Sequence, residues 1–231
     1  MSHVNQPLLA SDARPTPEAA YTLADMAPTQ RDKTGLALVL TGTSLLVLCT
    51  AALILTSPVP RLFAWHPPLN SLALALFALG IATVQPPTPP AAVRATRLGV
   101  HKNVLGTAVL LLCAGTTFMY YNKEANGAEH GTTPHGSAGY IVLLWMLVQA
   151  TIGGVAANTG KSGMWLYNLS GYLFITLALV TACAGGLLTD WARTRPAPLR
   201  VIAYGLGIPL IAAGLAMRVH PSKMAFGKRR A

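Results

Sequence analysis

Acidic residues are scarce in this 231-residue chain. It has seven Asp and Glu against seventeen Lys and Arg, a formal net charge of +10, and only 10% of its residues are charged. Six long apolar runs contain no Asp or Glu, which excludes a proton relay of intramembrane carboxylates in them. The three cysteines all lie in these runs and provide neither a disulfide framework nor the spacing of a zinc site.

The apolar runs are the dominant feature of the chain. Each is close to the ~20 apolar residues that cross a bilayer core, and none shows the continuous polar stripe of an amphipathic helix in a soluble protein. The sequence therefore predicts an all-α fold, an integral membrane six-helix bundle. The expected spans are Gly35–Ser57, Pro67–Val84, Leu98–Tyr121, Gly136–Ala157, Met164–Leu188 and Leu199–Met217.

The basic residues predict the orientation of the bundle. With the N-terminus in the cytosol, twelve Lys and Arg lie on the cytosolic side and five on the other, so the positive-inside rule places both termini in the cytosol. Residues 1–34 are expected to be a disordered cytosolic tail, 35–217 the transmembrane domain and 218–231 a basic cytosolic tail. The basic tail is interpreted as a topology determinant or a contact with anionic lipid, so no nucleic-acid partner is expected.

Three histidines lie near the starts of three expected spans. An ionisable residue at membrane depth is a functional-site candidate, although a single histidine at an interface commonly just bonds to water or headgroups. His66 and His135 begin spans that start on the same side, whereas His101 lies near the opposite face. Two imidazoles from facing helices suit ligation of one haem iron. Zinc would require more ligands gathered together.

The motifs around these histidines resemble the cytochrome b561 family of transmembrane haem proteins, over about residues 35–217. The resemblance implies a four-helix haem-binding core, made of the second to fifth spans, that holds two b haems. It implies that His66 and His135 are axial ligands of the haem iron on the non-cytosolic side and that His101 ligates the cytosolic one. The motifs that carry it are Trp65-His66-Pro67, Lys123-Glu124, His130-x4-His135-Gly136 and Leu169-Ser170-Gly171-Tyr172.

The fifth span departs from the family pattern. The second ligand of the cytosolic haem falls at Tyr167, and a shift of one residue would present Asn168 instead. Tyrosine ligates haem in some proteins, which makes Tyr167 the candidate replacement ligand. His220 is on the same side but follows the sixth span, and we expect it to be an ordinary tail residue. The sequence thus predicts one complete haem b site and a second site that lacks a histidine.

The resemblance also implies an activity. It is transmembrane electron transfer from cytosolic ascorbate to ferric iron or ascorbyl radical on the other side, as in an ascorbate-dependent ferrireductase. Such a protein would sit among membrane lipids, in an endomembrane (vacuole or lysosome, ER or vesicle) or the plasma membrane, and a homodimer is compatible with it. Two alternatives stay open: a one-haem relative that senses or buffers redox state, and a haem-free membrane scaffold or assembly protein.

Five side chains are candidates for substrate binding. On the cytosolic side, basic residues beside His101 could hold an anionic reductant, although the positive-inside rule explains them equally well. On the other side, a lysine and a histidine resemble the family's substrate loop, with a solvated loop as the simpler interpretation. These candidates are Arg94, Arg97, Lys102, Lys123 and His130.

Overall fold

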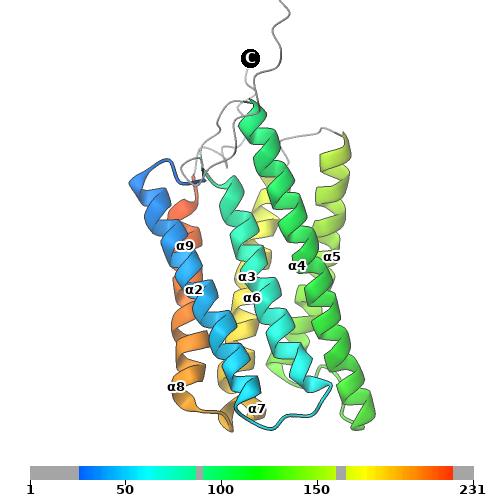
Figure 1. Ribbon diagram of the computed structural model, residues 1–231. Helices are drawn as coiled ribbons and strands as arrows, with labels where there is room; N and C mark the ends of the chain where they lie inside the picture. Colours follow the sequence, from blue (N-terminus) through cyan, green and yellow to red (C-terminus); the bar gives the residue numbers. More distant parts are fainter. Residues whose placement is uncertain (1–25, 87–90, 160–164, 221–231) are drawn as a thin grey trace, which may run out of the picture.

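The computed structural model describes residues 26–86, 91–159 and 165–220, which form a bundle of six long helices lying side by side (Figure 1). Six helices are long and apolar enough to cross a membrane, and no strand occurs in the described residues. The predicted all-α six-helix membrane bundle is therefore confirmed, and the protein is an integral, multi-pass membrane protein. The elements are α2 (Gln30–Leu55), η1 (Phe63–Trp65), α3 (His66–Val84), α4 (Ala91–Ala125), α5 (Pro134–Thr159), α6 (Trp165–Leu188), α7 (Asp190–Arg193), α8 (Ala197–Arg200), η2 (Val201–Gly207) and α9 (Ile208–Arg218).

The helices pack in pairs. Helix α3 packs along α4 and α5 along α6, whereas these two pairs touch each other at far fewer points. Helix α2 packs against both α3 and α9. We call the end of the bundle that holds Met26 and His220 the terminal end (upper in Figure 1), and the end that holds η1, α7 and the α4–α5 connection the hairpin end.

Glycines let α2 and the last span approach closely. A Cβ built on Gly35 would lie 2.9 Å from the carbonyl oxygen of Gly214, and one built on Gly42 would lie 2.5 Å from that of Gly207. These pairs are spaced seven residues apart on both helices, so the contact repeats after two turns. Small residues at a helix–helix contact are the usual way in which membrane helices gain van der Waals packing.

Several helices extend beyond the spans that the sequence predicts. Helix α2 begins at Gln30, so residues 30–34 belong to the first helix and not to the predicted tail of residues 1–34; Thr29 caps it by accepting from the Asp32 amide at 3.1 Å. Residues 1–25 of that tail lie outside the described residues. Helix α4 runs over 35 residues, roughly 50 Å, and so projects beyond a bilayer core. The last span begins at Ala197 and includes the π-helical stretch η2.

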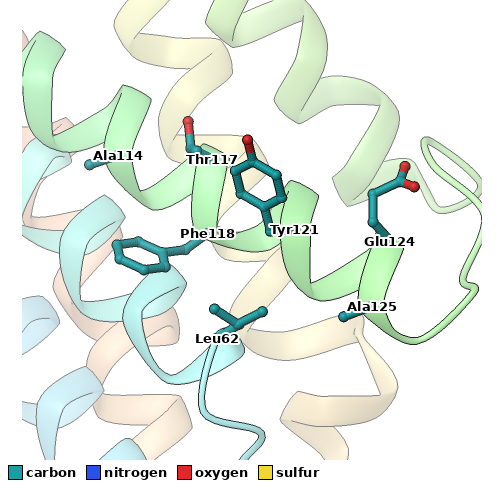
Figure 2. Close-up of a pocket in the computed structure, with 7 residues that line it drawn as sticks. All are labelled: Leu62, Ala114, Thr117, Phe118, Tyr121, Glu124 and Ala125. Atoms are coloured by element: carbon teal, nitrogen blue, oxygen red, sulfur yellow. The ribbon is translucent and has the colours of Figure 1, made fainter.

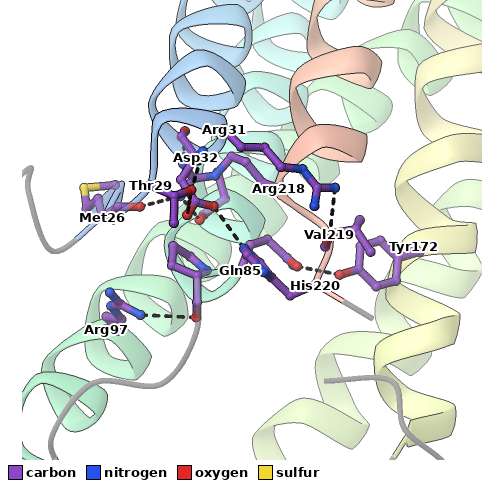
Figure 3. Close-up of polar contacts among 12 residues, drawn as sticks. Met26, Thr29, Arg31, Asp32, Gln85, Arg97, Tyr172, Arg218, Val219 and His220 are labelled. Atoms are coloured by element: carbon purple, nitrogen blue, oxygen red, sulfur yellow. Dashed lines mark hydrogen bonds and ion pairs between the residues drawn. The ribbon is translucent and has the colours of Figure 1, made fainter. Parts of the chain in front are cut away.

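The terminal end is closed by a buried polar cluster (Figure 3). Arg218, at the end of α9, is fully buried and donates to the carbonyl oxygens of Asp32 at 2.6 Å, Met26 at 2.7 Å and Ala82 at 2.7 Å. His220 Nε2 lies 3.0 Å from a carboxylate oxygen of the fully buried Asp32. The expectation that His220 is an ordinary tail residue is therefore wrong: it forms part of the contact between α2, α3 and α9.

Candidate functional site

At the hairpin end, the rings of His66 and His135 lie next to each other. His66 is the first residue of α3, and His135 is the second residue of α5, which begins with Pro134. Their ring centroids are 6.1 Å apart and their ring planes are inclined at 81°. Both residues are half-buried. The structure thus brings together the two histidines that the sequence placed at one depth, and each comes from a different helix pair.

Backbone carbonyl groups fix the orientation of both rings. His66 Nδ1 lies 3.0 Å from the carbonyl oxygen of Gly115 on α4, and His135 Nδ1 lies 2.8 Å from that of Thr181 on α6. A carbonyl oxygen only accepts, so each Nδ1 must carry the hydrogen, and each Nε2 retains its lone pair. This arrangement is the usual one for metal-ligating histidines, in which the second ring nitrogen donates to a carbonyl group or carboxylate.

The distance between the rings suits one iron atom. With metal–nitrogen bonds of about 2 Å and a nitrogen about 1 Å from the ring centre, two axial imidazoles place their centroids roughly 6 Å apart. The centroids of His66 and His135 are 6.1 Å apart. Haem sites in bundles are built from side chains on facing helices. Here the two rings come from α3 and α5, which belong to helix pairs that touch each other sparsely. The residues present therefore fit a haem with two histidine ligands.

Helix α6 makes room for one of these rings. The His135 ring lies against Gly185, where an added Cβ would be 2.6 Å from its Cε1 atom and 2.7 Å from its Nδ1 atom. Any side chain at this position would displace the imidazole. Gly185 and Thr181 are one turn apart, so a single turn of α6 both anchors and accommodates His135.

His101 repeats the geometry of His66 at the opposite end. Its Nδ1 lies 2.7 Å from the carbonyl oxygen of Gly80 on α3, fourteen residues after His66, and His66 bonds to Gly115, fourteen residues after His101. The α3–α4 pair therefore has a local two-fold relationship. Fourteen residues of helix span ~21 Å, so the two histidines lie well apart along the bundle.

The same offset points to position 167 as the counterpart of His135. Thr181, which accepts from His135, is fourteen residues after Tyr167. The Tyr167 hydroxyl lies against α5, where a Cβ on Gly153 would be 2.6 Å from it, and Gln149 donates to the Tyr167 carbonyl at 2.9 Å. No hydrogen bond joins Tyr167 to His101 within the described part of the chain, and Asn168 is exposed.

Direct hydrogen bonds join helices toward the terminal end of the bundle. Tyr172 donates to the Gln85 side chain at 2.5 Å, which joins α6 to α3, and Trp145 donates to Ser170 at 2.8 Å, which joins α5 to α6. The motif Leu169-Ser170-Gly171-Tyr172 thus supplies contacts between helices. His220 lies at the same end of the bundle as His101, but its ring bonds to Asp32 and so does not pair with His101.

The basic residues near His101 have different environments. Arg94 and Lys102 are exposed, so they are available to an anion in solution. Arg97 is buried and donates to the carbonyl oxygen of Pro86 at 3.4 Å, which assigns it a structural contact. Of the three predicted candidates on this side, two therefore lie on the surface.

Of the predicted substrate residues at the hairpin end, Lys123 lies in the last turn of α4 and His130 lies in the loop that joins α4 to α5. Lys123 donates to the carbonyl oxygen of Glu129. His130 lies 2.8 Å from a Glu124 carboxylate oxygen and 2.9 Å from the Tyr140 hydroxyl, and its ring stacks on Tyr120 at 4.7 Å between centroids. Both candidates thus form contacts within the loop, and His130 stays partly exposed.

A shallow apolar groove of about 630 Å³ lies beside this loop on the outer face of α4 (Figure 2). Phe118 in this groove stacks on Trp65, with 5.8 Å between ring centroids, directly before His66. The groove faces outward from the bundle and reaches the loop at Glu124. It is lined by Leu62, Ala114, Thr117, Phe118, Tyr121, Glu124 and Ala125.

Sequence reasoning missed the residues that support the histidines. Gly115, Gly80 and Thr181 contribute carbonyl groups, and nothing in their side chains marks them. The sequence did contain one signal for the two glycines. Gly80 follows His66 by fourteen residues, and Gly115 follows His101 by the same interval. Asn70 was also overlooked, although it is one helical turn after His66 and its side-chain nitrogen lies 3.0 Å from His66 Nδ1. In the part of the chain that the structure describes, no three His, Cys, Asp or Glu side chains converge.

Known proteins with similar sequences are membrane reductases. No family model matches the chain. It is similar to transmembrane reductase CYB561D2 of Mus musculus, with 32% identity over 103 residues, which are 43% of this chain and 46% of the relative. The similarity to the Homo sapiens protein is 33% identity over 105 residues, 44% of this chain and 47% of the relative. The chain spans about half the length of the curated relatives it matches, and these similarities support its resemblance to the cytochrome b561 family.

Proposed function

We propose that this protein is a haem b-dependent transmembrane oxidoreductase that transfers electrons from cytosolic ascorbate to ferric iron or ascorbyl radical on the other side. The observation that carries the proposal is the pair of His66 and His135, whose ring centroids are 6.1 Å apart and whose Nδ1 atoms both bond to backbone carbonyl groups. The names of the similar proteins, transmembrane reductases, support the same class of reaction.

The chain contributes ligation, orientation and insulation. His66 and His135 would hold the iron through their Nε2 atoms. The carbonyl groups of Gly115 and Thr181 accept from Nδ1 and so keep each Nε2 atom free to bind. The apolar helices around them exclude water and lower the local dielectric constant, which influences the potential of such a site. A bound b haem would supply a one-electron couple within the bilayer.

The terminal end favours a variant of this function with a single complete haem site. His101 has the same carbonyl bond as His66, but the position opposite it holds Tyr167, whose hydroxyl lies against Gly153. We therefore infer that His101 supports at most a weak or high-spin haem, and that electron entry from the cytosolic side is slow. Exposed Arg94 and Lys102 are the groups that would attract an anionic reductant there.

At the other end, the acceptor would approach the last turn of α4, which holds Lys123, and the loop after it, which holds His130. Both residues are held by neighbours, so the loop presents a fixed surface near the histidine pair. The placement of the terminal end in the cytosol rests on the unequal distribution of Lys and Arg.

The test uses the full-length chain, purified after expression with added haem. We expect a reduced spectrum of b type, and we expect vesicles that contain the protein and enclosed ascorbate to reduce an external ferric chelate. The variant His135→Ala should lack both properties. A purified wild-type chain that binds no haem would refute the proposal and favour the haem-free scaffold.

A further inference from the structure

The turn of α3 that follows His66 places a polar side chain beside its ring. Asn70 is one turn after His66, and its side-chain amide lies 3.0 Å from His66 Nδ1, on the same nitrogen that faces the Gly115 carbonyl. A Cβ on Gly115 would lie 2.9 Å from Asn70 Cγ, so this glycine is required for the amide to fit between the two helices.

The hydrogen on Nδ1 determines which end of the amide faces the ring. Because the Gly115 carbonyl accepts from Nδ1, this nitrogen cannot also accept from an amide N–H. The amide end beside Nδ1 must then be the oxygen. The other end of the amide, a buried position without a hydrogen-bond partner among the described residues, then carries the amide nitrogen. The Nδ1 hydrogen would be shared between two acceptors, a common arrangement in proteins.

The opposite end of the α3–α4 pair provides an internal reference. Leu105 is one turn after His101, as Asn70 is one turn after His66, and it packs over Gly80 as Asn70 packs over Gly115. Thus two equivalent positions carry a polar residue beside one histidine and an apolar residue beside the other. His101 therefore has one acceptor for its Nδ1 hydrogen, whereas His66 has two.

We propose that Asn70 is a positioning residue for His66: its Oδ1 atom, with the Gly115 carbonyl, holds the Nδ1–H tautomer and makes the imidazole a stronger electron donor through Nε2. The inference rests on the proposed haem function. A second acceptor on a ligating histidine raises the basicity of the ligand, which stabilises the ferric state. Asn70 thereby lowers the reduction potential of the site between His66 and His135.

The experiment compares wild type with Asn70→Leu and Asn70→Asp in optical redox titrations of the purified protein. We expect Asn70→Leu to raise the midpoint potential of the low-spin haem and Asn70→Asp, with a stronger acceptor, to lower it. The matched control is Asn122→Leu, a change of the same type on α4, which should leave the potential unchanged. An unchanged or lowered potential in Asn70→Leu overturns the proposal. If Asn70→Leu retains no haem, the test rests on Asn70→Asp. A midpoint potential of Asn70→Asp equal to or higher than that of wild type overturns the proposal.

A second measurement does not depend on haem. The ¹⁵N chemical shifts of the His66 ring in haem-free protein report which nitrogen carries the hydrogen. We expect the hydrogen on Nδ1; a hydrogen on Nε2 would overturn the inference, since that nitrogen could not then ligate iron. Wild-type protein that binds no haem would remove the proposed function and this inference together. Haem that is lost in His135→Ala but has the same potential in Asn70→Leu would remove the inference alone.

Discussion

The two ends of the four central helices use equivalent positions differently. At the hairpin end, His66 and His135 come from separate helix pairs and their rings face each other, with 6.1 Å between centroids. At the terminal end, the equivalent positions hold His101 and Tyr167, and hydrogen bonds such as that between Tyr172 and Gln85 join the helices directly. One end therefore brings two imidazoles together, and the other is held together by its own side chains.

The environments of His101 and His66 differ chiefly in one respect. His101 has the buried surroundings and the carbonyl partner that His66 has. What it lacks is an imidazole from the α5–α6 pair. The equivalent position there holds Tyr167, whose hydroxyl lies against Gly153. The contact with a backbone carbonyl group is thus present at both ends, whereas a second imidazole is present at one.

The largest expected effect comes from removing either member of the histidine pair. His66→Ala or His135→Ala should abolish the low-spin b-type signal, because a single remaining imidazole leaves one axial position of the iron open. His101→Ala should retain that signal, since His101 lies ~21 Å away along the helices. Optical and electron paramagnetic resonance spectra of the purified variants check this, and an unchanged spectrum in both pair variants would rule out the pairing.

A gain of ligation should follow from restoring the missing histidine. Tyr167→His is expected to raise the haem content toward two per chain and to add a second low-spin species, since position 167 is the counterpart of His135. The control Asn168→His places the same residue on an exposed position and should change nothing. Haem-to-protein ratios measure the outcome, and equal ratios in all three proteins would contradict the equivalence of the two ends.

A smaller effect is expected from filling the space beside His135. In Gly185→Ala the new Cβ would lie 2.6 Å from the ring, so the imidazole must shift. Overpacking of this kind costs about 1–3 kcal/mol, which corresponds to roughly 5- to 150-fold weaker haem retention. Gly154→Ala is the matched control, because nothing lies within 4 Å of its added Cβ. Haem loss to an external acceptor can be followed for both variants, and similar rates would count against the placement of His135.

The smallest expected effect on the haem spectrum comes from the cluster at the terminal end. Arg218→Met leaves three carbonyl groups, two of them in buried contacts, without their donor, so the free energy of unfolding should fall by about 3 kcal/mol or more. The low-spin signal should be unchanged, because the cluster joins α2, α3 and α9 and not the histidine pair. The exposed Arg193→Met should alter stability by less than about 0.5 kcal/mol. Denaturation in detergent measures both, and a loss of haem without loss of stability in Arg218→Met would be inconsistent with this assignment.

Much of the architecture could be predicted from the sequence because membrane spans are determined by length and hydropathy. The six runs, the shared depth of His66 and His135, and the absence of a histidine opposite His101 all follow from residue types and the count of crossings. The boundaries were less predictable. Asp32 is a charged residue that the sequence placed in a tail, yet it is buried, because Thr29 and His220 are brought to it only in the folded chain.

The supporting contacts of the site could not be predicted for a related reason. Gly115 and Thr181 act through backbone carbonyl groups, which every residue has, so their side chains carry no signal. Gly185 matters because it lacks a side chain at a point of close approach, which depends on the packing of α5 against α6. Arg97 has a surface-type side chain that the structure buries, and its hydrogen bond to the carbonyl oxygen of Pro86 is visible only in the folded chain.

The most direct test of the account is the number of low-spin haems that the purified wild-type chain holds. Quantitative electron paramagnetic resonance, together with the haem-to-protein ratio, gives that number. The account predicts one low-spin haem with two histidine ligands per chain, lost in His135→Ala, and at most a weak or high-spin signal from the His101 position. Two low-spin haems with histidine pairs, or none, would contradict it.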